Sequence, residues 1–275
     1  MATSTYRDTP IVLTIAGSDS SGGAGIQADI KAISATGAYA CSVITALTAQ
    51  NTRGVSSIFP IAPLFVEQQL DAVFTDLSVA AVKIGMLADA EIIHSVTKKL
   101  RQYKPKSIVV DPVMVATSGD RLLEPDAMAA LKDQLLPLAS VITPNLPEGA
   151  ALIGETTPTN QQEMDNLIDK LKALKIAPIL LKGGHLENSP NSCDLLITES
   201  DIQSFQAKRI STSNTHGTGC TLSSAIASYL AQGYPISQAI ELAKHYITQA
   251  ITHADRLEVG AGHGPVNHFY MFSQR

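Results

Sequence analysis

The residues best suited to chemistry form one turn, Asn214-Thr215-His216-Gly217-Thr218-Gly219-Cys220. Its glycines allow the backbone to bend so that successive N–H groups point to one spot, and the helix expected from Thr221 adds the positive end of its dipole. Such an arrangement binds phosphate or a developing phosphoryl charge. Cys220 would lie in the same positive field, which lowers the pKa of a thiol. The turn therefore predicts an anion site with a reactive cysteine, and the alternative is a buried thiol in the first turn of a helix.

Carboxylates at two expected strand ends are candidates for a metal site. Asp111 ends a buried type of strand directly before Pro112, and Asn145 and Glu148 open the helix after a later strand. Asp111 could instead cap a helix, and Glu148 could merely complement the dipole of the helix that it opens. Together, at neighbouring strand ends, Asp111 and Glu148 favour a hydrated Mg²⁺ site, because Mg²⁺ is usually bound through one or two carboxylates and water.

A lysine follows another apolar strand. Lys182 comes after Ile179-Leu180-Leu181 and before Gly183-Gly184. A lysine at this place can reach a nucleotide phosphate. The other interpretation is a solvated strand terminus, and the neighbouring glycines favour the phosphate contact.

The glycine-rich segment from Gly17 to Gly25 resembles a dinucleotide fingerprint only superficially. That fingerprint needs an acidic residue about 20 positions further on, and no Asp or Glu occurs from Ile30 to Val66. A Walker A motif is also excluded, because no Gly-Lys-Ser/Thr follows. The distance from the expected strand to Gly23 is long for an ordinary connection between a strand and a helix. We therefore expect a loop that closes over a substrate, followed by a helix.

Short apolar runs alternate with amphipathic segments of helix length, which predicts a mostly parallel sheet with helices on both faces. The expected strands are Ile11–Ala16, Val43–Thr48, Ala81–Ile84, Ser107–Val110, Val141–Thr143, Ile179–Lys182 and Cys193–Ile197. The expected helices are Ala24–Thr36, Pro63–Thr75, Ala88–Tyr103, Pro125–Leu136, Gln161–Leu174, Thr221–Gln232 and Ile236–Ala254. Ligands gather at the carboxyl ends of parallel strands, so the polar loops above are expected to form one site. No repeat or linker is evident, and we expect residues 1–275 to form a single domain.

Composition excludes several classes of protein. The chain has 275 residues, 45% hydrophobic and 16% charged, which is not the composition of a disordered chain. Its net charge is −5 and no basic stripe is present, so nucleic acid is not expected as a main partner. Apolar runs such as Ile11–Ala16 are far shorter than a membrane span, and the first ten residues contain no secretory segment. We expect a cytoplasmic protein with a small-molecule substrate.

Taken together, the motifs resemble those of one known family. The segments AGSDSSGGAGIQADIK, SVITALTAQNT, KIGM, DPVM, TPNLPE, LLKGGH and NTHGTGCTLS are closely similar to hydroxymethylpyrimidine/phosphomethylpyrimidine kinases of thiamine biosynthesis, in the ribokinase-like superfamily. The resemblance extends from Ile11 to the C-terminal GPVNHF. It implies a three-layer α/β/α fold with a mostly parallel central sheet, a homodimer, ATP as phosphoryl donor and Mg²⁺. The implied acceptors are 4-amino-5-hydroxymethyl-2-methylpyrimidine and then its monophosphate.

The resemblance also implies roles for residues of this chain. The pyrimidine substrate would be bound by Gln50, with Gly17, Asp29, Met86 and Val113 around it. The nucleotide would be contacted by Lys182, Asn145 and Thr215, and the metal would be served by Asp111 and Glu148. The anion hole would be formed by Gly217, Thr218 and Gly219, and the catalytic base would be Cys220. Sugar kinases of the superfamily carry aspartate at the position of this cysteine.

Two departures bear on the alternatives. Thr117 stands where many members of the family have lysine, and no cysteine occurs near Ala116, where pyridoxal kinases often place one. A pyridoxal kinase nevertheless remains an alternative, because pyridoxal is also a flat heteroaromatic molecule with a hydroxymethyl arm. A thiol hydrolase that uses Cys220 with His216 and a non-catalytic pyrimidine sensor are further alternatives, which substrate turnover would distinguish.

Overall fold

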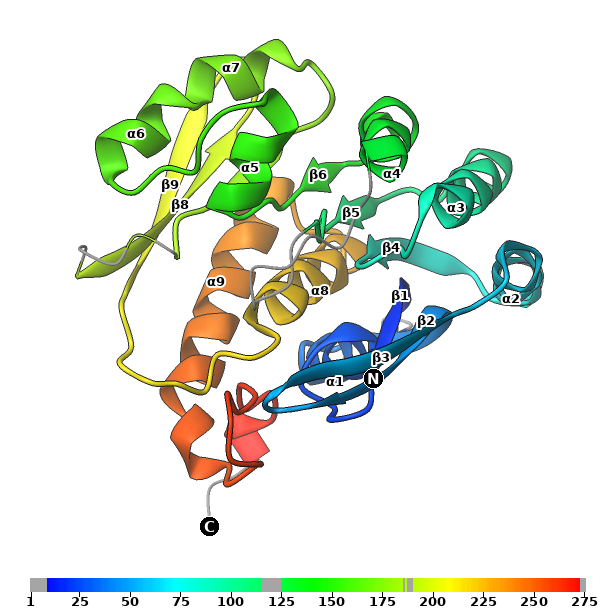
Figure 1. Ribbon diagram of the computed structural model, residues 1–275, viewed down its shortest axis with the longest axis horizontal. Helices are drawn as coiled ribbons and strands as arrows, with labels where there is room; N and C mark the ends of the chain where they lie inside the picture. Colours follow the sequence, from blue (N-terminus) through cyan, green and yellow to red (C-terminus); the bar gives the residue numbers. More distant parts are fainter. Residues whose placement is uncertain (1–8, 115–124, 185, 187–189, 273–275) are drawn as a thin grey trace, which may run out of the picture.

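The computed structural model describes residues 9–114, 125–184, 186 and 190–272. Their strands form one sheet in the order β3-β2-β1-β4-β5-β6-β7-β8-β9 (Figure 1). The strands from β2 to β7 in this order are parallel, whereas β3, β8 and β9 are antiparallel strands at the two edges. The bounds are β1 Ile11–Asp19, β2 Tyr39–Asn51, β3 Gly54–Pro60, β4 Val79–Ile84, β5 Ile108–Val110, β6 Val141–Ile142, β7 Ile179–Lys182, β8 Asn191–Ile197 and β9 Ile202–Lys208.

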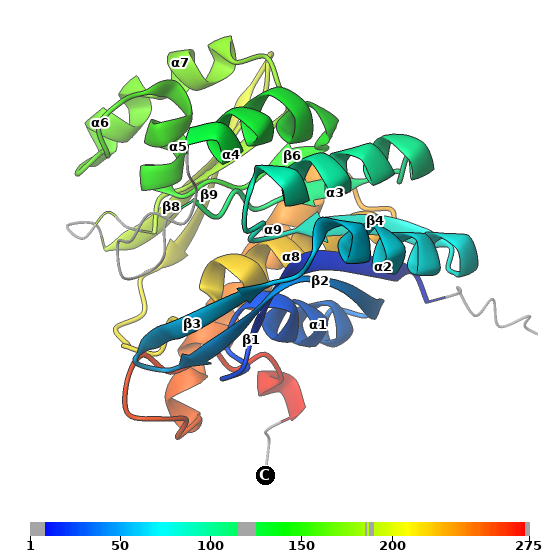
Figure 2. The ribbon, with the colours of Figure 1, turned by 45° about the vertical axis from the view of Figure 1, so that its right-hand side comes forward.

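Helices cover both faces of this sheet, as the alternation of strands and helices predicts (Figure 2). One face is covered by α1 (Gly25–Ala35), α8 (Thr218–Ala231) and α9 (Ile236–Thr252). The other face is covered by α2 (Pro63–Asp76), α3 (Ala90–Tyr103), α4 (Pro125–Ala130), α5 (Leu146–Ile153), α6 (Gln161–Asn166) and α7 (Ile168–Ala173). The three-layer α/β/α architecture is therefore confirmed.

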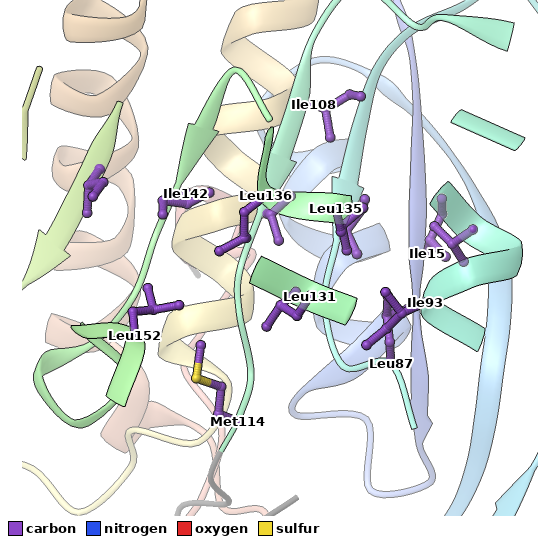
Figure 3. Packing of buried hydrophobic residues seen from close by; sticks show 14 of the residues in the cluster. Ile15, Leu87, Ile93, Ile108, Met114, Leu131, Leu135, Leu136, Ile142 and Leu152 are labelled. Carbon is purple, nitrogen blue, oxygen red and sulfur yellow. The ribbon is translucent and has the colours of Figure 1, made fainter. Parts of the chain in front are cut away.

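The core lies in two layers, one on each side of the sheet. Successive residues of a strand point to opposite faces, so Val12 packs against the α1 and α8 side while Leu13 and Ile15 pack against the α2 and α3 side. Figure 3 shows part of the second layer, in which Ile15 of β1 and Ile93 of α3 share one cluster with Leu131 and Leu135. Strands buried on both faces need apolar residues at nearly every position, which explains their continuous apolar runs.

The elements differ from the sequence-based expectation at the edges of the sheet. The strands β3 and β9 were not expected, because all seven residues of β3 are exposed and β9 is mostly exposed. Neither strand carries the pattern of a buried one. The expected helix over residues 161–174 is two shorter helices, α6 and α7, and the expected helix from Pro125 continues beyond α4 as a π-helical and a 3₁₀ turn.

The first loop is shorter than the sequence suggested. β1 continues to Asp19, because Ser18 and Asp19 pair with β2 after a bulge, and α1 begins at Gly25. The connection is then Ser20 to Ala24, which lies within the ordinary length of such loops. The argument for a closing loop from its length is therefore wrong. Within the described ranges, no helix has the length and apolar character needed to cross a membrane.

Candidate active site

The carboxyl ends of the parallel strands and the start of α8 meet at one edge of the sheet. α8 begins at Thr218, three residues earlier than expected, with Gly217 as its N-cap at φ +77°. A Cβ atom on Gly217 would lie 1.8 Å from the Gly23 carbonyl oxygen, so only glycine fits between the two loops. Inside the turn, the Thr218 N–H and hydroxyl both donate to the Thr215 carbonyl oxygen. The predicted anion turn is thus a helix start packed closely against the first loop.

An ion pair lies against this helix start. Lys182 Nζ, at the end of β7, is 2.7 Å from Asp111 Oδ1, and Thr143 Oγ1 donates to the same oxygen. A Cβ atom on Gly219 would be 3.3 Å from Lys182 Nζ and 3.5 Å from Asp111 Oδ2. Burial alone would raise the pKa of Asp111, but Lys182 and then Lys83 lower it below its ordinary value. The structure thus brings Lys182, Asp111 and the anion turn together.

Glu148 and Asn145 form a capping box at the start of α5. The Glu148 N–H donates to Asn145 Oδ1, and the Asn145 N–H donates to Glu148 Oε2 at 2.7 Å. Both residues therefore cap α5, and Glu148 lies in its first turn, as its interpretation as a complement of the helix dipole expects. Burial raises the pKa of Glu148 to about 7, and the nearby Asp111 charge adds to this effect while Lys182 opposes it.

The carboxylates of Asp111 and Glu148 are chemically suited to a divalent cation. Both are buried, and the negative charge of Asp111 raises the pKa of Glu148, which a cation close to both would relieve. Their oxygens are the donors that Mg²⁺ prefers. Among the described residues, no group of three or more His, Cys, Asp or Glu side chains is placed to hold a metal. The donor set therefore fits a largely hydrated ion rather than one enclosed by protein ligands.

Cys220 lies partly buried in the first turn of α8. The expectation of a lowered thiol pKa is wrong. Burial raises the pKa of Cys220 to about 11, and the attraction of Lys83 only reduces this shift. The physical reason is desolvation, which disfavours the charged thiolate more than nearby positive charge favours it.

The residues expected around the pyrimidine lie in three places along the edge of the sheet. Gly17 touches Met86, because a Cβ atom on Gly17 would be 2.7 Å from Met86 Cε. Gln50 is tied to the first loop by hydrogen bonds between its backbone and Ser20 Oγ. Val113 lies two residues after Asp111, and its N–H donates to the Asp111 carbonyl oxygen. Their contacts with a substrate remain predictions.

Asp29 lies deeper than the other expected substrate residues. Its carboxylate is fully buried and accepts hydrogen bonds from Thr14, Ser224 and the Lys83 ammonium. Both carboxylate oxygens of Asp29 thus accept hydrogen bonds from protein groups. Contact of Asp29 with a substrate remains a prediction, and the structure buries this carboxylate against Ser224, one helical turn after Cys220.

Sequence reasoning missed Lys83 and Asp19. Lys83 is a charged residue inside the apolar run Ala80-Ala81-Val82-Lys83-Ile84, which is a signal that the sequence does contain. Asp19 Oδ2 lies 2.8 Å from His216 Nε2, so His216 holds the anion turn against the first loop. Its partner could not be found from the sequence, because nothing there pairs two residues so far apart.

The comparisons with known proteins agree with this geometry. The family model described as phosphomethylpyrimidine kinase matches residues 19–267. The chain belongs to this family. The chain is 51% identical over 258 residues to the hydroxymethylpyrimidine/phosphomethylpyrimidine kinase of Escherichia coli (strain K12), covering 94% of this chain and 97% of that protein. It is 52% identical over 262 residues to the enzyme of the same name from Rhizobium meliloti (strain 1021), covering 95% and 98%.

A solved structure shows a similar fold. The pyridoxal kinase of Bacillus subtilis, in its complex with ADP, aligns with a TM-score of 0.89 and 34% identity over 97% of this chain and 100% of that one. The expected membership of the phosphomethylpyrimidine kinase family and the ribokinase-like fold are thus confirmed. Ala116 and Thr117, where this member departs from the expected pattern, lie outside the described residues.

Proposed function

We propose that this protein transfers the terminal phosphoryl group of ATP to 4-amino-5-hydroxymethyl-2-methylpyrimidine, and then to the resulting monophosphate, in thiamine biosynthesis. The observation that carries the proposal is the contact between the start of α8 and the Lys182–Asp111 ion pair. It places a helix N-terminus, a cation and a carboxylate within one small space. These are the parts that phosphoryl transfer needs for positioning and for charge stabilisation.

The chain's own residues divide the work of the reaction. Lys182 contacts the phosphates of the nucleotide, together with Asn145 and Thr215. Because the Thr218 N–H already donates to Thr215, the transferring phosphoryl group is bound mainly by the N–H groups of Gly219 and Cys220 at the helix start.

The proton and the electrons balance in a simple transfer. The hydroxymethyl oxygen attacks the terminal phosphorus, the new O–P bond forms, and the bond to the bridging oxygen breaks, so that its electron pair stays on ADP. The hydroxyl proton passes to the thiolate of Cys220. The transition state of phosphoryl transfer is loose, so this proton moves late and the base contributes less than positioning does.

Mg²⁺ would be held at Asp111 and Glu148, largely through water, and would neutralise charge on the phosphate oxygens. The carboxylate of Asp111 is kept ionised by Lys182, although burial opposes this. It is thus ready to bind a cation at neutral pH. Glu148 additionally fixes the start of α5 through its capping box.

Pyridoxal is the second candidate substrate, because of the structural likeness to the pyridoxal kinase of Bacillus subtilis. The pyrimidine is favoured by the family match and by identities above 50% to enzymes named for it. We also propose a cytoplasmic homodimer in which the whole chain is one domain. The single sheet from Ile11 to Lys208, with α8 and α9 packed on it, supports the one-domain assignment.

The test is mass spectrometry of the products formed from the hydroxymethylpyrimidine with ATP and Mg²⁺, with pyridoxal in a parallel reaction. We expect a monophosphate and then a diphosphate of the pyrimidine. Asp111→Asn should lower turnover at least about 100-fold, whereas Asp201→Asn, at an exposed turn, should leave it unchanged. Formation of pyridoxal phosphate alone would transfer the assignment to pyridoxal kinase, and absence of any phosphorylated product would reject both.

A further inference from the structure

A completely buried ion pair lies beneath the candidate site, and its lysine, Lys83, has no part in the reaction described so far. Lys83 Nζ, on β4, is 2.8 and 2.9 Å from the two carboxylate oxygens of Asp29, on α1, and neither side chain has any exposed surface. Two apolar side chains of similar volume would often be at least as stable in such a place. Stability alone therefore does not explain why an ion pair, rather than apolar side chains, lies next to the reactive groups.

The pair connects the helix that carries Cys220 to its neighbours. Gly25 and Asp29 are four residues apart on α1, and Cys220 and Ser224 are four residues apart on α8. Residues with this spacing lie on one face of a helix. Ser224 Oγ donates to Asp29 Oδ1 at 2.7 Å, and Cys220 lies one helical turn before Ser224 on the same face of α8. α1 and α8, which lie side by side (Figures 1 and 2), are thus joined at the ion pair, one helical turn from Cys220.

Charges face Cys220 from several elements. Lys83 comes from β4 and Lys182 from the end of β7, whereas Asp29 comes from α1 and Asp111 from the end of β5. After burial itself, Lys83 has the largest influence on the pKa of Cys220 and lowers it, and Asp29 has a smaller influence in the opposite direction. A Cβ atom on Gly85 would lie 2.8 Å from Lys83 Nζ, so glycine there leaves room for the ammonium group.

We propose that Lys83 is a positioning residue for phosphoryl transfer, which holds α1 against α8 through Asp29 and Ser224 and keeps a buried positive charge beside the helical turn that carries Cys220. The catalytic part of this inference rests on the proposed function, because it takes Cys220 as the acceptor of the hydroxyl proton. The electrostatic part depends only on the contacts and charges around the thiol.

The test measures the thiol directly. Cys220 is alkylated with iodoacetamide across a range of pH, and the modified peptide is quantified by mass spectrometry in the wild type, Lys83→Met and Asp29→Asn. Each substitution leaves one buried charge without its partner, so the two variants are matched for structural damage. We expect the midpoint of alkylation to rise by about one pH unit in Lys83→Met and to fall in Asp29→Asn. A purely structural pair would move both midpoints in the same direction or neither, which would overturn the proposal.

The double variant Lys83→Met/Asp29→Asn guards against misfolding, because it leaves no unpaired charge. It should keep an upward shift of the midpoint, smaller than that of Lys83→Met, and a midpoint equal to the wild type would overturn the proposal. In the kinase assay, kcat of Lys83→Met should fall at least about tenfold, with KM for ATP within about threefold. The midpoints could shift as expected although neither the wild type nor any variant phosphorylates the pyrimidine. In that case the proposed function fails and the electrostatic inference stands.

Discussion

His216 Nε2 lies 2.8 Å from Asp19 Oδ2, and this contact joins the loop after β1 to the turn before α8. The same carboxylate accepts hydrogen bonds from the backbone N–H groups of Ser21, Gly23 and Ala24. Asp19 therefore fixes the conformation of its own loop and the position of the anion turn together. The loop after β1 and the turn before α8, which would face the acceptor and the phosphoryl group, are therefore held together by one carboxylate.

Asp19→Asn tests this relationship. We expect a loss of about 1–3 kcal/mol in the free energy of unfolding, because a buried carboxylate loses charge-assisted hydrogen bonds. Burial alone would raise the pKa of Asp19, but the hydrogen bonds from His216 and Ser21 lower it well below its ordinary value of 3.8. The stabilisation is therefore complete above about pH 4 and lost as the pH falls further. Denaturant titrations at pH 7 and pH 3 measure both effects.

The control for this variant is Asp169→Asn, on an exposed position of α7. It should change the free energy of unfolding by less than about 0.5 kcal/mol at either pH. In the kinase assay, Asp19→Asn should also lower kcat/KM at least about tenfold, because small displacements of positioned groups are costly. Equal behaviour of the two variants would show that Asp19 does not couple the loops.

Removal of the thiol tests the role of Cys220. We expect Cys220→Ala to lower turnover by about 10²-fold or more, the usual contribution of a general base. The Kd of a non-hydrolysable ATP analogue should stay within about threefold, because backbone N–H groups and Lys182 remain in place. Cys41→Ala is the matched control, since burial also raises the pKa of Cys41 to about 11 and this residue lies on β2 away from α8. Unchanged turnover in Cys220→Ala would exclude the thiol as the base.

The pH dependence of turnover follows from the same thiol. With a pKa of about 11, only roughly one molecule in 10⁴ carries the thiolate at pH 7. The active form is the deprotonated one, so kcat should rise with pH from 8 to 10, above the pKa of about 7 of Glu148, by up to about tenfold per unit. The residual turnover of Cys220→Ala should lack this rise. A wild-type kcat that is flat over this range would contradict proton transfer to the thiolate from the resting thiol.

The sequence predicts the centre of this fold better than its edges. Buried strands such as β1 and β7 need apolar residues on both faces, and that requirement is visible in the residues themselves. The edge strand β3 has only exposed residues, so its pairing with β2 depends on the hairpin and not on burial. The break between α6 and α7, within residues 161–174, could not be predicted either, because the apolar pattern continues across it.

The candidate site divides in a similar way. Residues at strand ends, such as Asp111 and Lys182, could be found because parallel strands bring their carboxyl ends together. The raised pKa of Cys220 could not be predicted, because the sequence indicates the start of a helix but not how deeply the thiol is buried. Burial outweighs the effect of the nearby positive charge. The pairing of His216 with Asp19 and of Lys83 with Asp29 could not be predicted either, because each pair joins elements that are distant in the chain.

The close contact of the two loops makes one further prediction, at Gly217. Gly217→Ala should lower the free energy of unfolding by about 2–4 kcal/mol, since it adds the strain of a positive φ to a clash with the Gly23 carbonyl oxygen. Gly233→Ala is the matched control, because Gly233 follows α8 at φ +91° with open space around it. That variant should lose only about 1 kcal/mol and keep full turnover. Thermal denaturation and kinase assays of both variants separate backbone strain from the clash, and the clash predicts loss of activity in Gly217→Ala alone.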